Sequence, residues 1–315
     1  MLYREFGATG IRVSEIGVGC GGLGAGRKIG LEPALEHALD LGINFFDTCD
    51  TYAEGASEET LGRVFRRHPR DRYVICTKFG GVIDDQGWHR DISVPHLHAA
   101  FAASCRRLGV DYFDIYLVHT PPRDIAREQD LFAALDKMRN QGKIRAYGLS
   151  LENGGFAAEI VNATGSRAIE ITFNLQAQVP RPEFLKVARE KGVGIITKSP
   201  LAQGLLTGSF RADDPPADDP RLIRMGRVEF ERQAEVHRKL RPILTAGGRS
   251  MAQGALAWLL SFPEVATVIP GITSLPRIEE TAGASGLRLT GAEMAALDEV
   301  LGIPPAARKR PKRSA

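Results

Sequence analysis

Residues 113–119 read FDIYLVH, a run of β-branched and aromatic side chains that ends in one ionisable residue. Seven other short runs are also rich in strand-forming residues. They are SEIGVGC at 14–20, INFFDT at 43–48, YVICTKF at 73–79, RAYGLS at 145–150, AIEITFN at 168–174, VGIITK at 193–198 and ATVIPG at 266–271. Several are apolar on both faces, which is typical of buried parallel strands. The sequence therefore predicts eight strands of a parallel sheet.

Longer segments with helical spacing separate these runs, among them residues 33–41 and 131–141. Eight strands alternating with helices is the number that a closed barrel needs. We therefore predict an α/β fold, a (β/α)8 TIM barrel with an N-terminal β-hairpin at residues 2–13, and we assign residues 1–303 to this single domain. An open doubly wound sheet also alternates strands and helices, and it remains the structural alternative at this point.

The composition is that of an ordinary globular protein, with 43% hydrophobic and 25% charged residues among 315. Part of the formal net charge of +3 comes from the basic segment at residues 304–315, where no apolar period continues. We predict a disordered tail there. The tail is free of aromatic residues and gives a base no stacking platform, so we expect no nucleic-acid partner. Salt-dependent nucleic-acid binding through the tail is kept as a hypothesis.

Nothing in the sequence points to export or to a membrane partner. The N-terminus lacks the apolar core of a signal peptide, and no run approaches the roughly 18 apolar residues of a membrane span. We therefore expect a cytoplasmic protein. Its four cysteines show no CxxC spacing, which favours free thiols over a disulfide framework or a zinc site, and we expect no metal.

Two insertions are longer than ordinary strand-to-helix loops. They cover residues 80–92, with the sequence GGVIDDQGWHRDI, and residues 202–227. Loops of this length in compact domains are usually functional or mobile. Both follow predicted strands, so both would lie on the C-terminal face, where barrel enzymes have their active sites.

Ionisable residues stand at the ends of three consecutive strands. Asp47, Lys78 and His119 take these positions, and Tyr52 follows Asp47 by five residues. In a closed barrel these ends meet at one mouth. Taken singly, His119 could be an ordinary hydrogen-bonded rim histidine and Asp47 a turn former. Three in succession exceed what solvation of a rim requires, and they favour a functional site.

These four residues can together move a proton. An ammonium beside a tyrosine lowers its pKa from about 10 and makes it a better acid, and Lys78 could supply that charge. Asp47 could hold the ammonium, while His119 could orient a carbonyl oxygen. Because no nucleophile is needed, the set points away from acyl transfer and toward reduction with a cofactor that brings the hydride.

Three stretches, GINFFDTCDTY, VICTKFG and DIYLVHTPP, resemble the catalytic blocks of the aldo-keto reductase superfamily. The opening YREFGATGIRVSEIGVGCGGLG is similar to its N-terminal hairpin and first strand, and the similarity runs from about residue 2 to about residue 301. The resemblance implies a catalytic tetrad of Asp47, Tyr52, Lys78 and His119, carbonyl or alcohol substrates, and NADP(H) bound without a Rossmann domain. The superfamily also includes potassium-channel β subunits, so a cofactor-sensing subunit with little turnover is the alternative function.

The resemblance also implies a cofactor site. KSPLAQGLLTG at 198–208 resembles the segment that wraps the pyrophosphate, and VIPGITSLPRIEETAGA at 268–284 resembles the adenosine-phosphate site at a helix N-terminus. The implied cofactor contacts are Gly21, Gly22, Asp47, Ser150, Glu170, Lys198, Ser199, Pro200, Leu201, Gln203, Gly204, Pro270, Gly271, Ile272, Thr273, Ser274, Arg277, Glu280 and Thr281. Arg277 would meet the 2′-phosphate, so NADP(H) is expected to be preferred and NAD(H) possible. A solvated Arg277 on a helix face is the other interpretation.

Several residues depart from the family pattern. Leu151 follows Ser150 where the family often has Asn, and Gly271 stands where some members place a basic residue. Glu170 replaces a usual glutamine and Lys198 replaces an aromatic residue beside the nicotinamide. Neighbouring strands lie about 4.8 Å apart, so we hypothesise a Glu170 to Lys198 ion pair, against the alternative that both side chains turn to solvent.

For substrate contacts we name Tyr52, His119 and Trp88. Trp88 would form a wall of the substrate pocket, or else it would only anchor the long loop at 80–92. The leading hypothesis is an NADP(H)-dependent oxidoreductase that interconverts aldehydes, ketones or aldoses with alcohols, with Tyr52 as the general acid and base. The sequence leaves open the substrate, the direction of the reaction in the cell and the oligomeric state.

Overall fold

A computed structural model describes residues 1–23, 31–85, 87–152, 154–178, 181, 183–208, 223, 226–271 and 274–304. Its main sheet has eight parallel strands, in the order β12-β11-β10-β9-β8-β5-β4-β3. They are β3 (Val18–Gly19), β4 (Phe45–Asp47), β5 (Val74–Phe79), β8 (Phe113–His119), β9 (Ile144–Leu151), β10 (Ala168–Thr172), β11 (Gly194–Lys198) and β12 (Val265–Val268). Parallel bridges from Ile16 to Val268 and from Gly19 to Gly271 join the two edges. The sheet therefore closes into a TIM barrel, and the open doubly wound alternative is wrong.

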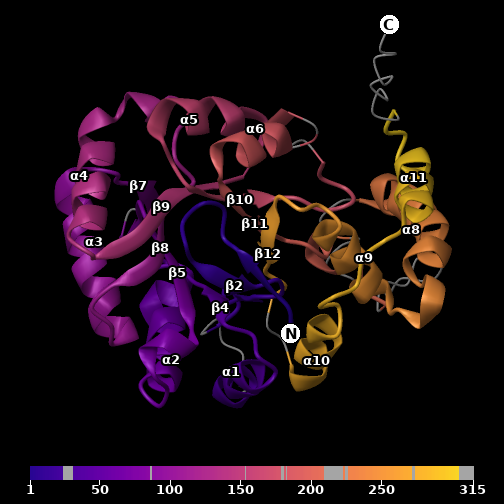
Figure 1. Ribbon diagram of the computed structural model, residues 1–315, viewed down its shortest axis with the longest axis horizontal. Coiled ribbons are helices and arrows are strands. Elements are labelled where there is room, and N and C mark those ends of the chain that lie inside the picture. The colour runs from indigo at the N-terminus through magenta and orange to yellow at the C-terminus, as the bar shows by residue number, and fades with distance from the viewer. Residues whose placement is uncertain are drawn as a thin grey trace, which may run out of the picture.

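Helices surround this barrel (Figure 1). They are α1 (Leu31–Asp40), α2 (Ala56–Phe65), α3 (Val94–Leu108), α4 (Gln129–Asn140), α5 (Ala157–Thr164), α6 (Glu183–Lys191), α8 (Arg227–Leu244), α9 (Met251–Leu260), α10 (Leu275–Ala282) and α11 (Gly291–Val300). The segments predicted at 33–41 and 131–141 are α1 and α4. In the described part of the chain, no helix combines the length and apolar character that a membrane span requires.

Local sequence sets the ends of α3. The Ser93 hydroxyl accepts a hydrogen bond from the His96 amide, which satisfies one free N–H at the helix N-terminus. Gly109 ends the helix with φ 71°, a left-handed conformation that favours glycine. Helix α3 therefore begins and ends where short polar and glycine signals occur, while its apolar face packs inward.

The N-terminal end of the barrel is filled by apolar side chains. The hairpin β1 (Tyr3–Glu5) and β2 (Arg12–Ser14) brings in Phe6, Ile11 and Val13. These residues are fully buried against inward-pointing strand residues such as Phe45 and Leu117. The plug leaves only the C-terminal end of the barrel open for polar chemistry.

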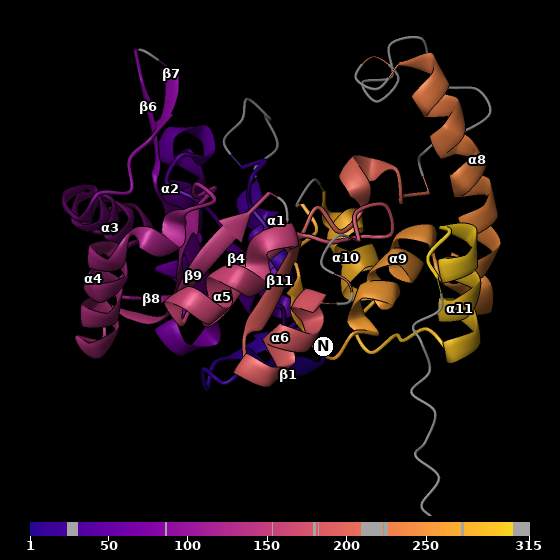
Figure 2. The same cartoon turned by 90° about the horizontal axis from the view of Figure 1, so that it is seen from above.

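The first of the two long insertions projects from the C-terminal face of the barrel (Figure 2). Residues 80–92 form a second hairpin, β6 (Gly81–Asp84) and β7 (Gly87–Arg90), which stands clear of the barrel. Of the insertion at 202–227, the structure describes residues 202–208, 223, 226 and 227. Of the predicted tail at 304–315, only Pro304 is among the described residues.

Candidate active site

Turns with unusual backbone conformations surround the barrel mouth. In the described chain, six residues other than glycine have positive φ, between 45° and 54°. All six follow a barrel strand at its C-terminal end. They are Ala53, Glu54, Thr120, Ser199, Ala202 and Gln203. Such conformations cost of order 1 kcal/mol or more each and are retained where surrounding structure holds them, often at functional sites.

Lys78 forms a buried ion pair with Asp47. Asp47 is the last residue of β4, and Lys78 lies on the neighbouring strand β5. The Lys78 ammonium donates to Asp47 Oδ2 at 2.6 Å and to the Thr48 carbonyl at 2.9 Å. Both side chains are almost fully buried. The structure therefore brings together two of the four predicted catalytic residues.

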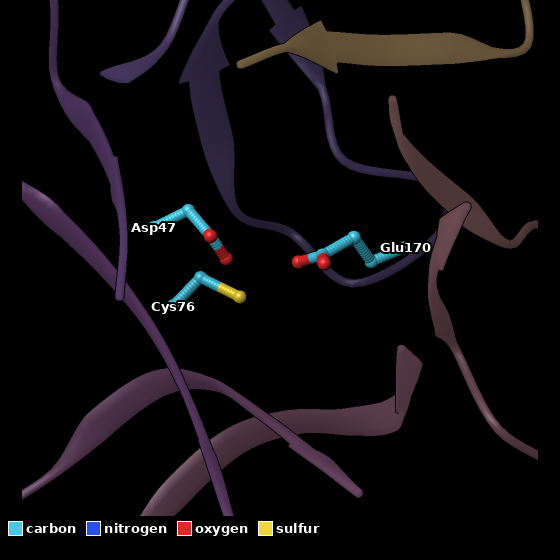
Figure 3. Close-up of side chains that lie close together, drawn as sticks. All are labelled: Asp47, Cys76 and Glu170. Atoms are coloured by element: carbon cyan, nitrogen blue, oxygen red, sulfur yellow. The ribbon is translucent and has the colours of Figure 1, made fainter. Parts of the chain in front are cut away.

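Glu170 places a second carboxylate beside the Lys78 ammonium. Its Oε2 lies 3.2 Å from Lys78 Nζ, although β10 and β5 are not neighbours in the sheet. Figure 3 shows Asp47, Cys76 and Glu170 pointing toward one another in the barrel interior, and their ligand-type atoms lie within 4.8 Å of each other. Three such groups could hold a metal ion, but Lys78 supplies the positive charge between the two carboxylates. Sequence reasoning noted Glu170 but did not predict this pairing.

The three charges shift one another's pKa values. Burial raises the pKa of Asp47 well above its usual range, and Glu170 raises it further against the effect of Lys78. Burial also acts to raise the pKa of Glu170, but Lys78, Lys198 and a hydrogen bond from Ser150 contribute to lowering it to about 2. Burial alone would lower the pKa of Lys78, but the two carboxylates raise it well above its usual range. Lys78 is therefore a permanently charged ammonium at the base of the site.

Tyr52 lies beside this ammonium. It begins the short 3-10 helix η1 (Tyr52–Gly55), and Lys78 Nζ lies 5.2 Å from the centre of its ring. Burial raises the pKa of Tyr52 well above 10, and Lys78 offsets only part of this effect. The expectation of a net lowered pKa is therefore wrong for the free protein. Tyr52 is protonated at neutral pH, as a proton donor must be.

His119 completes the predicted tetrad and has an unexpected partner. Its ring meets that of Tyr52 edge-on, with centroids 6.1 Å apart. Burial and then Lys78 lower the pKa of His119 to about 4, so the imidazole is neutral near pH 7. Its Nδ1 lies 3.2 Å from the thiol of Cys49, which sequence reasoning treated only as a free thiol. The sequence carried no signal of this contact, since Cys49 and His119 lie 70 residues apart.

Lys198 and Glu170 belong to one polar network. Their Nζ and Oε1 atoms are 3.9 Å apart. Ser150 connects them, since its hydroxyl donates to Glu170 at 2.8 Å and accepts from Lys198 at 3.2 Å. Lys198 is closer to Glu152, at 3.0 Å, and Glu170 is closer to Lys78. The hypothesised pair therefore exists as a secondary contact within a larger network, and neither Lys198 nor Glu170 turns away to solvent.

A cavity of about 540 Å³ opens beside these residues. It is lined by glycines at the end of β3 and just after it, by Asp47 and Tyr52, and by the segments that follow β11 and β12. The predicted residues that line it are Gly21, Gly22, Asp47, Tyr52, Glu170, Lys198, Ser199, Pro200, Leu201, Gln203, Gly204, Pro270, Gly271 and Arg277. Gly19, Thr207 and Ile269, which the sequence did not single out, also line it.

The remaining predicted cofactor residues have different positions. Ser150 is fully buried and contacts Glu170 and Lys198, which line the cavity. Ser274 is the N-cap of α10, and its side chain makes no capping hydrogen bond. Arg277 forms an ion pair with Glu280 on the next turn, and the buried Thr281 hydroxyl donates to carbonyls of its own helix. Ile272 and Thr273 lie outside the described residues.

Trp88 lies on the projecting hairpin. Its side chain is 50% exposed and does not line the cavity. It pairs across the hairpin with Ile83 and packs over Gly81, where a Cβ atom would lie 2.8 Å from the indole nitrogen. In this arrangement Trp88 contacts its own hairpin.

Comparison with known proteins gives one consistent result. A model of the Aldo/keto reductase family matches residues 15–302. The chain is 31% identical over 300 residues to the NADP(+) aldo-keto reductase yakc of Schizosaccharomyces pombe, covering 91% of this chain and 88% of that protein. It is 27% identical over 325 residues to the NADH-specific methylglyoxal reductase of Escherichia coli, covering 95% and 98%. The holo form of aldo-keto reductase AKR11C1 from Bacillus halodurans has a TM-score of 0.82 at 26% identity, covering 98% and 99%.

Proposed function

Because the chain belongs to the aldo/keto reductase family and is an NAD(P)H-dependent oxidoreductase, we propose that it interconverts aldehydes, ketones or aldoses with alcohols, and that Tyr52 is the general acid and base. The observation that carries this proposal is the position of Tyr52. Its ring lies 5.2 Å from the Lys78 ammonium and meets the neutral His119 ring edge-on, and Tyr52 lines the wall of a cavity.

Each residue of the site has its own role in proton transfer. When bound, a reduced nicotinamide cofactor supplies the hydride that the carbonyl carbon accepts. Tyr52 gives its hydroxyl proton to the carbonyl oxygen, so its O–H bond breaks as the alcohol O–H bond forms. The phenolate left behind is stabilised by Lys78. Asp47 and Glu170 hold that ammonium in place.

His119 is suited to orienting the carbonyl. Burial and then Asp50 raise the pKa of the Cys49 thiol, so this thiol keeps its proton. The thiol has one proton and donates it to Asp50 Oδ1 at 3.1 Å, so its contact with His119 Nδ1 is compatible with either tautomer of the neutral ring. In the tautomer that carries the proton on Nε2, His119 can donate a hydrogen bond to the carbonyl oxygen, where negative charge develops in the transition state.

The cavity fits a nicotinamide dinucleotide. Its volume lies within the usual range for cofactor sites, and Gly19, Gly21 and Gly22 let a ligand approach the backbone closely. The segment from Ser199 to Gly204 would hold the pyrophosphate. The N-terminus of α10, with Ser274 uncapped and Arg277 one turn along, would hold an anionic group at the far end.

We further propose a moderate preference for NADP(H), with NAD(H) also accepted. Arg277 can meet a phosphate with two hydrogen bonds, but Gly271 adds no second cation and Glu280 competes for the guanidinium. The two curated relatives bear names with different cofactors, one NADP(+) and one NADH-specific.

The proposed setting is the cytoplasm, with a small carbonyl or alcohol as the partner and with neither nucleic acid nor membrane bound. All four cysteines are free, as is usual for intracellular proteins.

The proposal is tested by steady-state oxidation of NADPH and NADH with a panel of aldehydes, ketones and aldoses. We expect many turnovers with at least one carbonyl class, and faster turnover with NADPH at limiting cofactor. A burst of about one turnover followed by no further oxidation would instead indicate the cofactor-sensing alternative. Binding of neither cofactor would contradict the proposal altogether.

A further inference from the structure

We propose that Glu170 and Lys198 act as opposed charges that set the relative affinity of the site for oxidised and reduced nicotinamide cofactor. This inference rests on the proposed function, because it requires a nicotinamide in the cavity.

The chemistry fixes which part of the cavity the nicotinamide occupies. Tyr52 protonates the carbonyl oxygen, so the carbon that receives the hydride lies one bond from that oxygen. The nicotinamide must therefore reach the neighbourhood of Tyr52. Glu170 and Lys198 line the same cavity as Tyr52. Both charges consequently act on the ring from close range.

The two side chains are held firmly at that position. Glu170 is fixed by Lys78 at 3.2 Å and by the Ser150 hydroxyl at 2.8 Å, and its side chain is 1% exposed. Lys198 is fixed by the same hydroxyl and by Glu152, and its side chain is 16% exposed. A shared hydroxyl contacts both charges and holds them side by side at the cavity.

Their charges have opposite effects on the cofactor. The oxidised nicotinamide ring carries one positive charge that the reduced ring lacks. Glu170 favours the oxidised ring and Lys198 disfavours it. With both present, the two effects largely cancel. Removal of either one should therefore shift the balance, and the two removals should shift it in opposite directions.

The experiment measures dissociation constants of NADP⁺ and NADPH by fluorescence or calorimetric titration, in the absence of substrate. Lys198→Met should lower the ratio of the NADP⁺ constant to the NADPH constant by about tenfold, and Glu170→Gln should raise it by about tenfold. This is the size expected of a unit charge several ångströms away in a partly solvated cavity. The double variant should return to within about threefold of the wild type.

Glu152→Gln is the matched control, since Glu152 belongs to the same network but its side chain is 68% exposed. It should move the ratio by less than about twofold. Circular dichroism of each variant checks folding. If Glu170→Gln fails to fold, the sign of the shift in Lys198→Met still decides the question.

Two contrary outcomes have different meanings. Normal binding of both cofactors with an unmoved ratio, or with shifts in the same direction, would overturn the role of the pair and leave the proposed function intact. Failure of the wild-type protein to bind either cofactor would overturn the proposed function, and the inference with it.

Discussion

At the scale of single residues, Lys78 determines the electrostatics of the site. A buried ammonium is costly unless it is paired, and here two carboxylates and a carbonyl surround it. Its pairing keeps the charge fixed beside Tyr52. The second carboxylate, Glu170, also connects Lys78 through Ser150 to Lys198 on the cavity wall. Lys78 and the wall of the cavity are therefore connected through one polar network.

The predicted preference for NADPH over NADH depends on Arg277. Arg277→Ala should weaken NADPH binding by roughly ten- to hundredfold and change NADH binding little, because charge-assisted hydrogen bonds to phosphate contribute about 1.5 to 3 kcal/mol. Titration of each variant with both cofactors measures the effect. Glu280→Gln is the control, since it frees the guanidinium and should not weaken NADPH binding. Equal affinities of the wild type for the two cofactors would rule out this role for Arg277.

At the scale of elements, helix α2 supports the strand that carries Lys78. Glu58 of α2 accepts a hydrogen bond from Thr77, the neighbour of Lys78, at 2.6 Å. Its other oxygen accepts from Arg107 of α3 at 2.7 Å. Helices α2 and α3 pack closely at this point because Gly62 faces the backbone of Arg107 and Leu108. The position of Lys78 therefore depends on a tight contact between two helices.

Gly62→Ala tests this contact. An added methyl would collide with the Arg107 carbonyl, and overpacking of this kind costs about 1 to 3 kcal/mol. We expect a fall of that size in the free energy of unfolding, measured by denaturant titration. Gly291→Ala at the start of α11 is the control, because nothing lies within 4 Å of its Cβ position. Equal stability of the two variants would show that the helices can separate at no cost.

At the scale of the whole molecule, the barrel was predictable because each strand carries its own signal. The run FDIYLVH coincides with β8, residue for residue, and it ends at the mouth. It is apolar up to His119 except for Asp114, a buried carboxylate that pairs with Arg70 and Arg145. The first barrel strand, β3, covers only Val18–Gly19 of its run at 14–20, since Ser14 belongs to β2 and Ile16 makes only an isolated bridge to Val268. The insertion at 80–92 was expected as a loop, but cross-strand pairing makes it a hairpin.

The site was predictable only in part. Strand ends meet at one mouth in any closed barrel, so Asp47, Lys78 and His119 could be grouped from sequence position alone. The contact between Glu170 and Lys78 spans the barrel interior, and it depends on how the strands tilt and close. The shift in the pKa of Tyr52 likewise depends on burial that no local pattern records. The sequence therefore could not supply the distances between residues far apart in the chain, nor the burial of individual side chains.

The central claim, that Tyr52 is the proton donor, is tested most directly by comparing Tyr52→Phe with the wild type in both carbonyl reduction and cofactor binding. The change removes one hydroxyl and no phosphate contact. We expect reduction to fall by about 10² to 10⁴-fold or more, while the dissociation constant for NADPH stays within about twofold. A Tyr52→Phe protein that keeps more than about a tenth of the wild-type rate would contradict the claim and assign the proton to another group.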